Sequence, residues 1–467
     1  MLAGAAIGGG LAIGWALWPR AYPPNLVAAE GERIFNAWLK IGTDGHVTVV
    51  VPQVEMGQGS YTVIPQIIAD ELGADWRTIA VEPAPLSPAY ANTVFADEWH
   101  EGWWPKEKVQ ATGGSSTVRG YEFVARQAGA AARALLCKAA AKRWDADWLA
   151  CDTEGGFVTR GDDRLRFGEL VEDAARMSLP KDIPLRTGNG VDRLSGRGMN
   201  RLDIPAKLDG SANFAADIRL PDMVYASIRQ GPLGDSILKS VDKAAADRIF
   251  GVLEIVEHER WVAAIATNWW AANRALDAMH PRFFNRDRFS GDRSIDRALV
   301  NALGVEGTRV AEAGDVDAAL ENARVSTAEY SVGLAPHAAI EPLSATATLV
   351  DGRLQLWIAT QLPGLARDAA ARAIGIDPED VTIHPMLVGG SFGRKYEVEI
   401  AGQVAILALK IKRPVQLTWS RAEDLMHEPF RPAARARMTA RLGRAGHIDA
   451  WLAQVMPLLQ EKLTAAA

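Results

Sequence analysis

Three glycine-rich turns constrain this chain more than any other feature. They are Gly57-Gln58-Gly59, Gly113-Gly114-Ser115-Ser116 and Gly389-Gly390-Ser391-Phe392-Gly393. Each stands between a strand-like run and an expected helix. Glycine lets a backbone approach a ligand closely, and a helix N-terminus presents free N–H groups, so such turns suit anionic oxygens. One such turn more often only ends a strand, but three together predict one large polar anion held by several segments.

Side chains in the first two turns add hydrogen-bonding groups to this pattern. Gln58 offers an amide donor and acceptor, and Ser115, Ser116 and Thr117 stand where the N-cap oxygens of a long alanine-rich helix are expected. Competing nucleotide motifs fail, because "GGSFGRK" lacks the phosphate-loop spacing and no G-x-G-x-x-G opens a helix. The sequence therefore indicates neither a phosphate-loop nucleotidase nor a simple Rossmann dehydrogenase.

Composition excludes several other classes. A net charge of -6 over 467 residues gives no reason to expect nucleic acid as a partner. The two cysteines, Cys137 and Cys151, form no C-x-x-C, so this chain is not expected to carry an iron–sulfur cluster or c-type haem. The eight histidines show no metal-ligand spacing, and no G-x-S-x-G is present. If the chain does redox chemistry, its electrons must leave through something other than these centres.

Periodicity predicts a multi-domain α+β chain. We expect a first domain over residues 27–185, a second over 195–310 with its linker, a third over 320–456, and a tail over 457–467, with a helical end from Leu452. Residues 1–26 are uncharged before Arg20 and break at "YPP". About eighteen helical residues span about 27 Å, near the roughly 30 Å hydrocarbon core. This segment predicts export to the periplasm or anchoring that faces it, with a buried N-terminal helix as the alternative.

Five motifs in this order carry a family resemblance: "VEMGQGSYTVIPQIIADELG", "TGGSSTVRG", "RLDIPAKLDGSANFAADIRLPDMVYASI", "APHAAIEP" and "LVGGSFGRK". Over residues 28 to about 455 the chain resembles the molybdopterin-binding large subunit of the xanthine dehydrogenase/aldehyde oxidase family. The resemblance is greatest to the exported branch with isoquinoline 1-oxidoreductase and membrane-bound aldehyde dehydrogenases. It implies two molybdopterin-binding domains, over 27–185 and an incomplete one over 320–456. Between them it implies an α/β hammerhead domain.

The resemblance also implies roles for site residues. Gln58 would contact the molybdenum–pterin centre, with Gly57 and Gly59 allowing close approach. The second turn would hold the pterin phosphate, or the pyrophosphate of the cytosine dinucleotide form, through Gly113, Gly114, Ser115, Ser116 and Thr117. The third turn would border the metal and the substrate through Gly390, Phe392 and Gly393, with Tyr396 and Glu397 also in the substrate pocket. No side chain of the chain would ligate the metal directly.

The implied reaction is hydroxylation of an aldehyde or aromatic N-heterocycle with water as the oxygen source. The implied partners are a 2Fe-2S small subunit and a c-type cytochrome subunit. This chain departs from the pattern of the eukaryotic members at Ala335 and at Tyr396, where those members have the glutamate of the substrate pocket. The purine specificity of the eukaryotic members is therefore not implied. The family's catalytic glutamate lies in a Gly-Glu motif that we do not find. We therefore expect a truncated or split subunit, inactive alone and completed by a second polypeptide, with a non-catalytic scaffold without molybdenum as the alternative.

Overall fold

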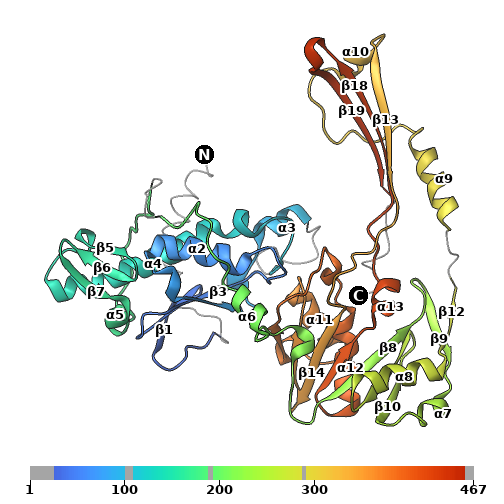
Figure 1. Ribbon diagram of the computed structural model, residues 1–467, viewed down its shortest axis with the longest axis horizontal. Helices are drawn as coiled ribbons and strands as arrows, with labels where there is room; N and C mark the ends of the chain where they lie inside the picture. The colour runs from blue at the N-terminus through green and yellow to red at the C-terminus, as the bar shows by residue number, and fades with distance from the viewer. Residues whose placement is uncertain (1–25, 100–108, 188–192, 287–290, 458–467) are drawn as a thin grey trace. The chain divides into compact units, whose positions relative to one another are not determined.

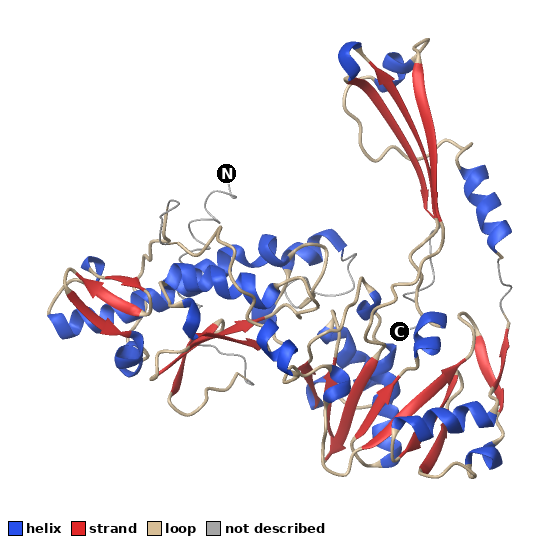
Figure 2. Cartoon of the chain, viewed as in Figure 1, coloured by secondary structure: helices blue, strands red, loops and turns tan. Residues whose placement is uncertain are grey.

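The computed structural model describes residues 26–99, 109–187, 193–286 and 291–457 (Figures 1 and 2). Nearly all of the expected N-terminal segment 1–26 and tail 457–467 lies outside these ranges. The chain forms two compact units. One comprises Met1–Tyr225 and Leu343–Thr418, and the other Ala226–Pro342 and Trp419–Ala467. Both units are discontinuous in sequence, so the expected linear domain boundaries remain predictions.

The first unit contains a sheet in the order β1-β2-β3-β4, comprising β1 (Glu32–Asn36), β2 (Leu39–Gly42), β3 (Val47–Val51) and β4 (Ile79–Pro83). Strands β3 and β4 run parallel, and the chain passes between them through α2 (Ser60–Leu72). Helix α4 (Thr117–Trp144) packs on α2 (Figure 1). A Cβ on Gly129 of α4 would lie 2.5 Å from the Ile68 carbonyl oxygen of α2, so glycine is what permits this close packing.

Smaller elements complete this part of the first unit. Helix α3 (Thr93–Trp99) precedes α4, and a small sheet β5-β6-β7 follows it, formed by β5 (Asp152–Glu154), β6 (Phe157–Arg160) and β7 (Asp163–Arg166). Helix α5 (Phe167–Ala174) comes next, and α6 (Ile204–Asp209) lies further along the chain. The core about α2 and α4 combines aliphatic side chains with buried aromatic ones; Leu39, Ile41, Ile64, Ile68, Leu136, Tyr90 and Phe167 are fully buried.

The second segment of the first unit carries β14 (Ser344–Val350), β15 (Arg353–Ile358), β16 (Val381–Pro385) and β17 (Val415–Thr418), in the order β17-β14-β15-β16. The expected hairpin about Asp351-Gly352 is confirmed. Both residues have positive φ, 50° and 78°, as a tight two-residue hairpin turn requires. Helices α11 (Pro363–Ile374) and α12 (Glu399–Ile411) pack against each other beside these strands. The third glycine turn precedes α12.

The other unit begins with β8 (Val224–Gln230), whose first two residues belong to the first unit. It continues through β10 (Val252–Glu257) and β11 (Trp261–Ala266), in the order β10-β11-β8. Helices α7 (Lys243–Ala246) and α8 (Trp269–Met279) pack on them, beside the pair β9 (Ser236–Ser240) and β12 (Arg282–Asn285). A three-stranded antiparallel sheet in the order β13-β18-β19 follows, with β13 (Val325–Val332), β18 (Ala434–Leu442) and β19 (Ile448–Pro457). The second unit also contains the helices α9 (Asp292–Ala302), α10 (Val316–Leu320) and α13 (Arg421–Met426).

The α+β class is confirmed, and one expected element is wrong. Residues from Leu452 were expected to form a helical end, but 452–457 lie in strand β19. They alternate in exposure and pair in regular register with β18, so cross-strand pairing outweighs the helix-like local pattern. In the part of the chain that the structure describes, no helix is both long and apolar enough to cross a membrane.

Candidate functional site

The Gly57-Gln58-Gly59 turn is built around the buried carboxylate of Glu55. One oxygen of Glu55 accepts from the backbone N–H groups of Gly57 at 2.8 Å and Gly59 at 3.1 Å. The other accepts from Ser60 Oγ at 3.1 Å and from the backbone N–H of Tyr61 at 2.9 Å. Glu55 has no exposed surface, so its charge is satisfied by donors that a helix N-terminus supplies. This turn therefore already holds an anion that belongs to the chain.

Gln58 lies exposed at the tip of this turn, and its amide closes the turn. Its Nε2 donates to the Val54 carbonyl at 2.8 Å and to Ser60 Oγ at 3.1 Å, while its Oε1 accepts from the Met56 N–H at 2.8 Å. A Cβ built on either Gly57 or Gly59 would meet no atom within 4 Å, so protein packing does not fill the space beside the turn. The positive φ values, 108° and 87°, are what require glycine here.

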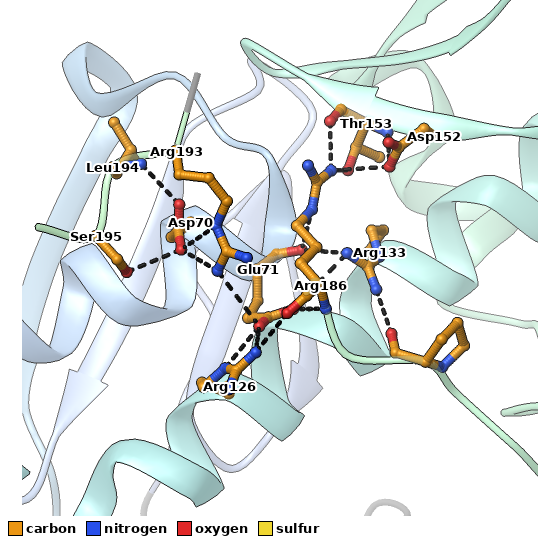
Figure 3. A network of polar contacts seen from close by, with 11 residues as sticks. Asp70, Glu71, Arg126, Arg133, Asp152, Thr153, Arg186, Arg193, Leu194 and Ser195 are labelled. Atoms are coloured by element: carbon orange, nitrogen blue, oxygen red, sulfur yellow. Dashed lines mark hydrogen bonds and ion pairs between the residues drawn. The ribbon is translucent and has the colours of Figure 1, made fainter. Parts of the chain in front are cut away.

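The C-terminal end of α2 is held by a second polar network (Figure 3). Asp70 accepts from Leu194 N–H at 2.7 Å and Ser195 Oγ at 2.8 Å. The neighbouring Glu71 is fully buried and accepts from Arg126 Nε at 2.7 Å and from the Arg186 N–H at 2.9 Å. Arg186 and residues 193–195 thus bind the end of α2 opposite the glycine turn.

The second turn differs from the expectation at its serines. Helix α4 begins at Thr117 with Ser116 at its N-cap, but no side chain caps the helix there. The buried Ser116 hydroxyl instead donates to the Gly113 carbonyl at 2.6 Å and accepts from Asn92 Nδ2 at 2.7 Å. Ser115 is exposed and has φ 51°, a strained value for a residue with a side chain. In the described part of the chain, the front of α4 is therefore left uncapped by side chains, with the exposed Ser115 before it.

The third turn does not lead directly into a helix, contrary to the expectation. Gly393 precedes a short 3-10 turn over Arg394–Tyr396, and α12 begins only at Glu399. The reason is local, since Lys395 N–H bonds to Ser391 Oγ at 3.0 Å and thereby closes the loop on itself. Phe392 is 70% exposed and has φ 59°. An exposed aromatic held in a strained conformation is typical of functional loops.

A buried polar network joins all three turns within the first unit. Thr112 lies just before the second turn. Its carbonyl accepts a hydrogen bond from Gln361 Nε2 at 2.8 Å, and its Oγ1 accepts one from the Val54 N–H at 2.9 Å. Gln361 Oε1 in turn accepts from Ser391 Oγ in the third turn. Gln53, just before the first turn, accepts from Thr117 Oγ1 at 3.0 Å. The structure therefore brings together the three turns that the sequence singled out.

Tyr396 and Glu397 follow the third turn. Tyr396 Oη donates to the Thr112 carbonyl at 3.3 Å, and its ring stacks on Phe95. A Cβ on Gly113 would lie 1.5 Å from Tyr396 Oη, so the close approach that Gly113 permits is to this tyrosine, not to a ligand. Burial raises the pKa of Tyr396 to about 12. Burial, reinforced by the nearby Glu399 charge, raises the pKa of the Glu397 carboxyl to about 7.

A small cavity lies beside the network. Its volume is about 20 Å³, enough for about one water molecule and far too small for a pterin. It is lined by Val51, Pro52, Val54, Tyr61, Pro83, Ala84, Gln110, Thr112, Thr360, Pro363 and Pro385. A large cofactor would therefore lie against the exposed side of the turns, where Gln58, Ser115 and Phe392 stand. These exposed polar and aromatic groups, with the uncapped front of α4, fit a large anionic ring system.

Sequence reasoning missed the residues that hold the turns. Glu55 had a signal, because a carboxylate just before a helix start favours capping. Gln53 and Gln361 had none, because their partners are distant in sequence. Gln53 bonds to Ala111 and Thr117, 58 and 64 residues away. Gln361 bonds to Ser391, 30 residues away, and to Thr112, 249 residues away. Arg201, which bonds to Glu55 at 2.9 Å, falls in a stretch that we expected to be a linker.

Comparisons with known proteins identify relatives of the chain. Two family models match, both described as molybdopterin cofactor-binding domain, over residues 5–95 and 304–457. The chain is 29% identical to the beta subunit of isoquinoline 1-oxidoreductase of Brevundimonas diminuta, over 90% of this chain and 60% of that protein. It is 27% identical to a membrane-bound aldehyde dehydrogenase of Gluconacetobacter polyoxogenes, over 88% and 54%. It is also 27% identical to a nicotinate dehydrogenase subunit of Pseudomonas putida, over 92% and 36%.

The chain thus spans between about a third and 60% of the length of these three relatives. Among solved structures, quinoline 2-oxidoreductase from Pseudomonas putida 86 is similar at a TM-score of 0.45 and 18% identity, over 56% of this chain and 39% of that chain. With its two molybdopterin cofactor-binding domains and these relatives, the chain is a homologue of the large subunits of the xanthine dehydrogenase family.

Proposed function

We propose that this chain is the molybdopterin-binding part of a molybdenum hydroxylase that oxidises an aldehyde or an aromatic N-heterocycle with water as the oxygen source. The observation that carries the proposal is the convergence of three glycine turns on one buried network through Gln53, Thr112 and Gln361. The names of the relatives support the substrate classes, since they include an isoquinoline oxidoreductase, an aldehyde dehydrogenase and a nicotinate dehydrogenase.

In this proposal the turns divide the cofactor between them. The uncapped front of α4 with Ser115 and Thr117 holds the phosphate, or the pyrophosphate of a cytosine dinucleotide form. Gln58 faces the molybdenum–pterin centre across the open side of Gly57 and Gly59. The first turn is less suited to a phosphate, because Glu55 already accepts from its N–H groups. The anion therefore belongs to the second turn.

When bound, the molybdenum cofactor supplies a two-electron oxidation with water as the oxygen donor. The chain's own residues position the substrate in this scheme. Phe392 presents an exposed ring against which an aromatic substrate stacks. Glu397, with its pKa raised to about 7, carries a proton on part of the molecules at neutral pH, so its carboxyl can hold a hydrogen bond as donor or acceptor. Tyr396, bound to Thr112, stays protonated and fixes the wall of the pocket.

The remaining components are also proposals. Electrons leave through a 2Fe-2S small subunit and a c-type cytochrome subunit, in keeping with relatives that are named as subunits. We propose that the general base comes from a Gly-Glu motif that we do not find in residues 1–467, where the pairs Gly31-Glu32 and Gly168-Glu169 lack the surroundings of that motif. We place the complex in the periplasm, or anchored facing it.

The test is the composition of the purified protein. The full chain, isolated with every subunit that copurifies, should contain molybdenum, pterin and cytidine in about equal amounts. The amounts are measured by metal analysis and by chromatography of the released pterin and nucleotide. Absence of all three from the assembled complex would rule out the cofactor assignment.

The second candidate is a scaffold subunit that keeps the fold without molybdenum. One observation favours it: both N–H donors of the Gln58 amide already bind within their own loop. The variant Gln58→Ala separates the two candidates. If Gln58 contacts the cofactor, the variant contains less molybdenum than the wild type, while the midpoint of unfolding of the chain is unchanged. If the chain is a scaffold, assembly and composition of the complex stay as in the wild type.

A further inference from the structure

The geometry points to Arg201 as a positioning residue that fixes the Gly57-Gln58-Gly59 turn from outside. This inference rests on the proposed function only for the identity of the ligand that the turn binds. The contacts by which Arg201 fixes the turn, which we call the clamp, do not depend on that function. Arg201 donates from Nη1 to the Gly57 carbonyl at 2.9 Å and from Nη2 to Glu55 Oε1 at 2.9 Å. It therefore binds the turn's backbone and the carboxylate around which the turn is folded.

Arg201 is itself held in place. Its Nε and Nη2 pair with the two oxygens of Asp203 at 3.0 and 2.7 Å, and Lys207 also binds this carboxylate. Asp203 is 6% exposed, and the paired cations hold its pKa down to about 2 against the opposing effect of burial. The pair therefore stays ionised at every pH at which the protein is expected to work. A planar guanidinium with donors on both edges is the group that can serve three acceptors together.

The segment that carries Arg201 runs along α2 in the opposite direction. Arg193 and Leu194 bind Asp70 near the end of α2, and Gln66 Nε2 donates to the carbonyls of Leu194 and Arg197. Further back, Leu202 N–H donates to Thr62 Oγ1 at 3.2 Å. We call residues 193–203 the strap. Along the strap, successive contacts lie nearer the N-terminus of α2. The last of them is the contact of Arg201 with the glycine turn.

The division of contacts gives the strap a function beyond holding α2. The contacts at Asp70 and Gln66 fix the strap on a helix that its own hydrogen bonds already keep straight. The contact at Gly57 instead fixes a loop whose two glycines allow many conformations. The loop carries Gln58, so the orientation of that amide depends on Arg201. Removing Arg201 should therefore loosen residues 55–61 and leave the rest of α2 unchanged.

The test compares three variants of the full chain, purified with its copurifying subunits. Arg201→Met removes the clamp. Arg193→Met removes the strap's contact at the far end of α2. Arg77→Met is the matched control, because Arg77 also pairs through two nitrogens with an aspartate two residues away, Asp75, but lies on the surface away from the turn. Amide hydrogen exchange is followed at Gly57, Gly59 and Tyr61, and molybdenum and pterin content is measured in each.

We expect Arg201→Met to speed exchange at these three amides by about tenfold or more, since they bond to Glu55. Of the three variants, we expect only Arg201→Met to lose cofactor, and a fourth, Arg201→Lys, should lose part of it. Unchanged exchange at the three amides in Arg201→Met overturns the inference. So does faster exchange that extends through residues 64–72 and appears equally in Arg193→Met, which shows a purely structural strap. If the wild type contains no molybdenum or pterin, the proposed function fails, while the exchange comparison still decides whether Arg201 fixes the turn.

Discussion

At the scale of single residues, Glu55 shows how a glycine turn can look like a phosphate site and not be one. Its carboxylate accepts from three backbone N–H groups and one hydroxyl, so the donors that would attract an external anion are already bound. The nearby Gln58 is left to act through its position, not through free donors. Among the residues that the structure describes, no carboxylate fills the second turn in this way, which is why the two turns serve different parts of one ligand in the proposal.

Replacing Glu55 with alanine should be costly. The change takes away one of the two buried carboxylates that pair with the Arg201 guanidinium and orphans the N–H groups of the turn. The expected loss in the free energy of unfolding is about 3 kcal/mol. Urea unfolding followed by circular dichroism measures it, with Glu172→Ala as a control, because Glu172 forms an exposed pair with Arg33. A loss as small as that of the control would show that the carboxylate does not hold the turn.

Glu423 gives a pH dependence whose sign can be worked out. It is 1% exposed, and burial raises the pKa of its carboxyl from 4.5 to about 7, although the Gln230 N–H and Arg229 favour the charged form. Between these two pH values the folded chain holds a proton that the unfolded chain has lost. Stability from this group is therefore full below pH 4.5 and is lost as the pH rises through 7, by about 3 kcal/mol at most.

The variant Glu423→Gln tests this effect. It keeps an oxygen that accepts from the Gln230 N–H but no longer titrates. Urea unfolding of wild type and variant between pH 5 and pH 8 should show the variant gaining stability over the wild type as the pH rises. Two curves that stay parallel over this range would contradict the assignment.

At the scale of elements, the sheet β13-β18-β19 has two different faces. One face carries Arg435, Arg437 and Arg441, which bind Asp296, the Leu303 carbonyl and the Ala319 carbonyl. Helices α9 and α10 pack on this face. The register places the side chains of the other face together, and they are mostly apolar: Ala328, Tyr330, Val332, Ala434, Ala436, Met438, Ala440, Trp451, Ala453 and Val455. Tyr330, Val332, Trp451 and Val455 are each about half exposed or more. The second face is therefore an apolar surface open to solvent.

Two neighbouring residues of β19 distinguish the faces. Val455 lies on the open face and is 52% exposed, whereas Met456 lies on the face under the helices, where a Cβ on Gly307 would come within 3.5 Å of it. We expect Val455→Lys to change the free energy of unfolding by less than about 0.5 kcal/mol and Met456→Lys to cost about 2 kcal/mol. Binding of the dye ANS should fall only in the first variant. Equal costs for the two would mean that the assignment of faces is wrong.

At the scale of the whole molecule, local patterns predicted the elements but not how they are joined. The hairpin at Asp351-Gly352, the end of α2 at Gly73 and the start of α4 at Thr117 follow from residues close in sequence. The three turns could be named in advance because glycine and serine mark them. That one buried network joins the three turns could not be predicted, since Gln361 and Thr112 are 249 positions apart in the sequence. The discontinuous units were hidden for the same reason: residues 343–418 join the first unit through contacts that no local pattern contains.

Gln361 is therefore the residue whose loss should separate the third turn from the other two. It is 3% exposed, its Nε2 binds the Thr112 carbonyl, and its Oε1 accepts from Ser391. Gln361→Ala leaves a cavity and removes one hydrogen bond each from the Thr112 carbonyl and the Ser391 hydroxyl, at a cost of about 3 kcal/mol. Hydrogen exchange should quicken at Thr112 and at Lys395, which lie on opposite sides of Gln361. The control is Gln355→Ala, which removes only a bond to His384 within one sheet. Exchange that quickens at Lys395 and not at Thr112 would show that the turns are held together by other contacts.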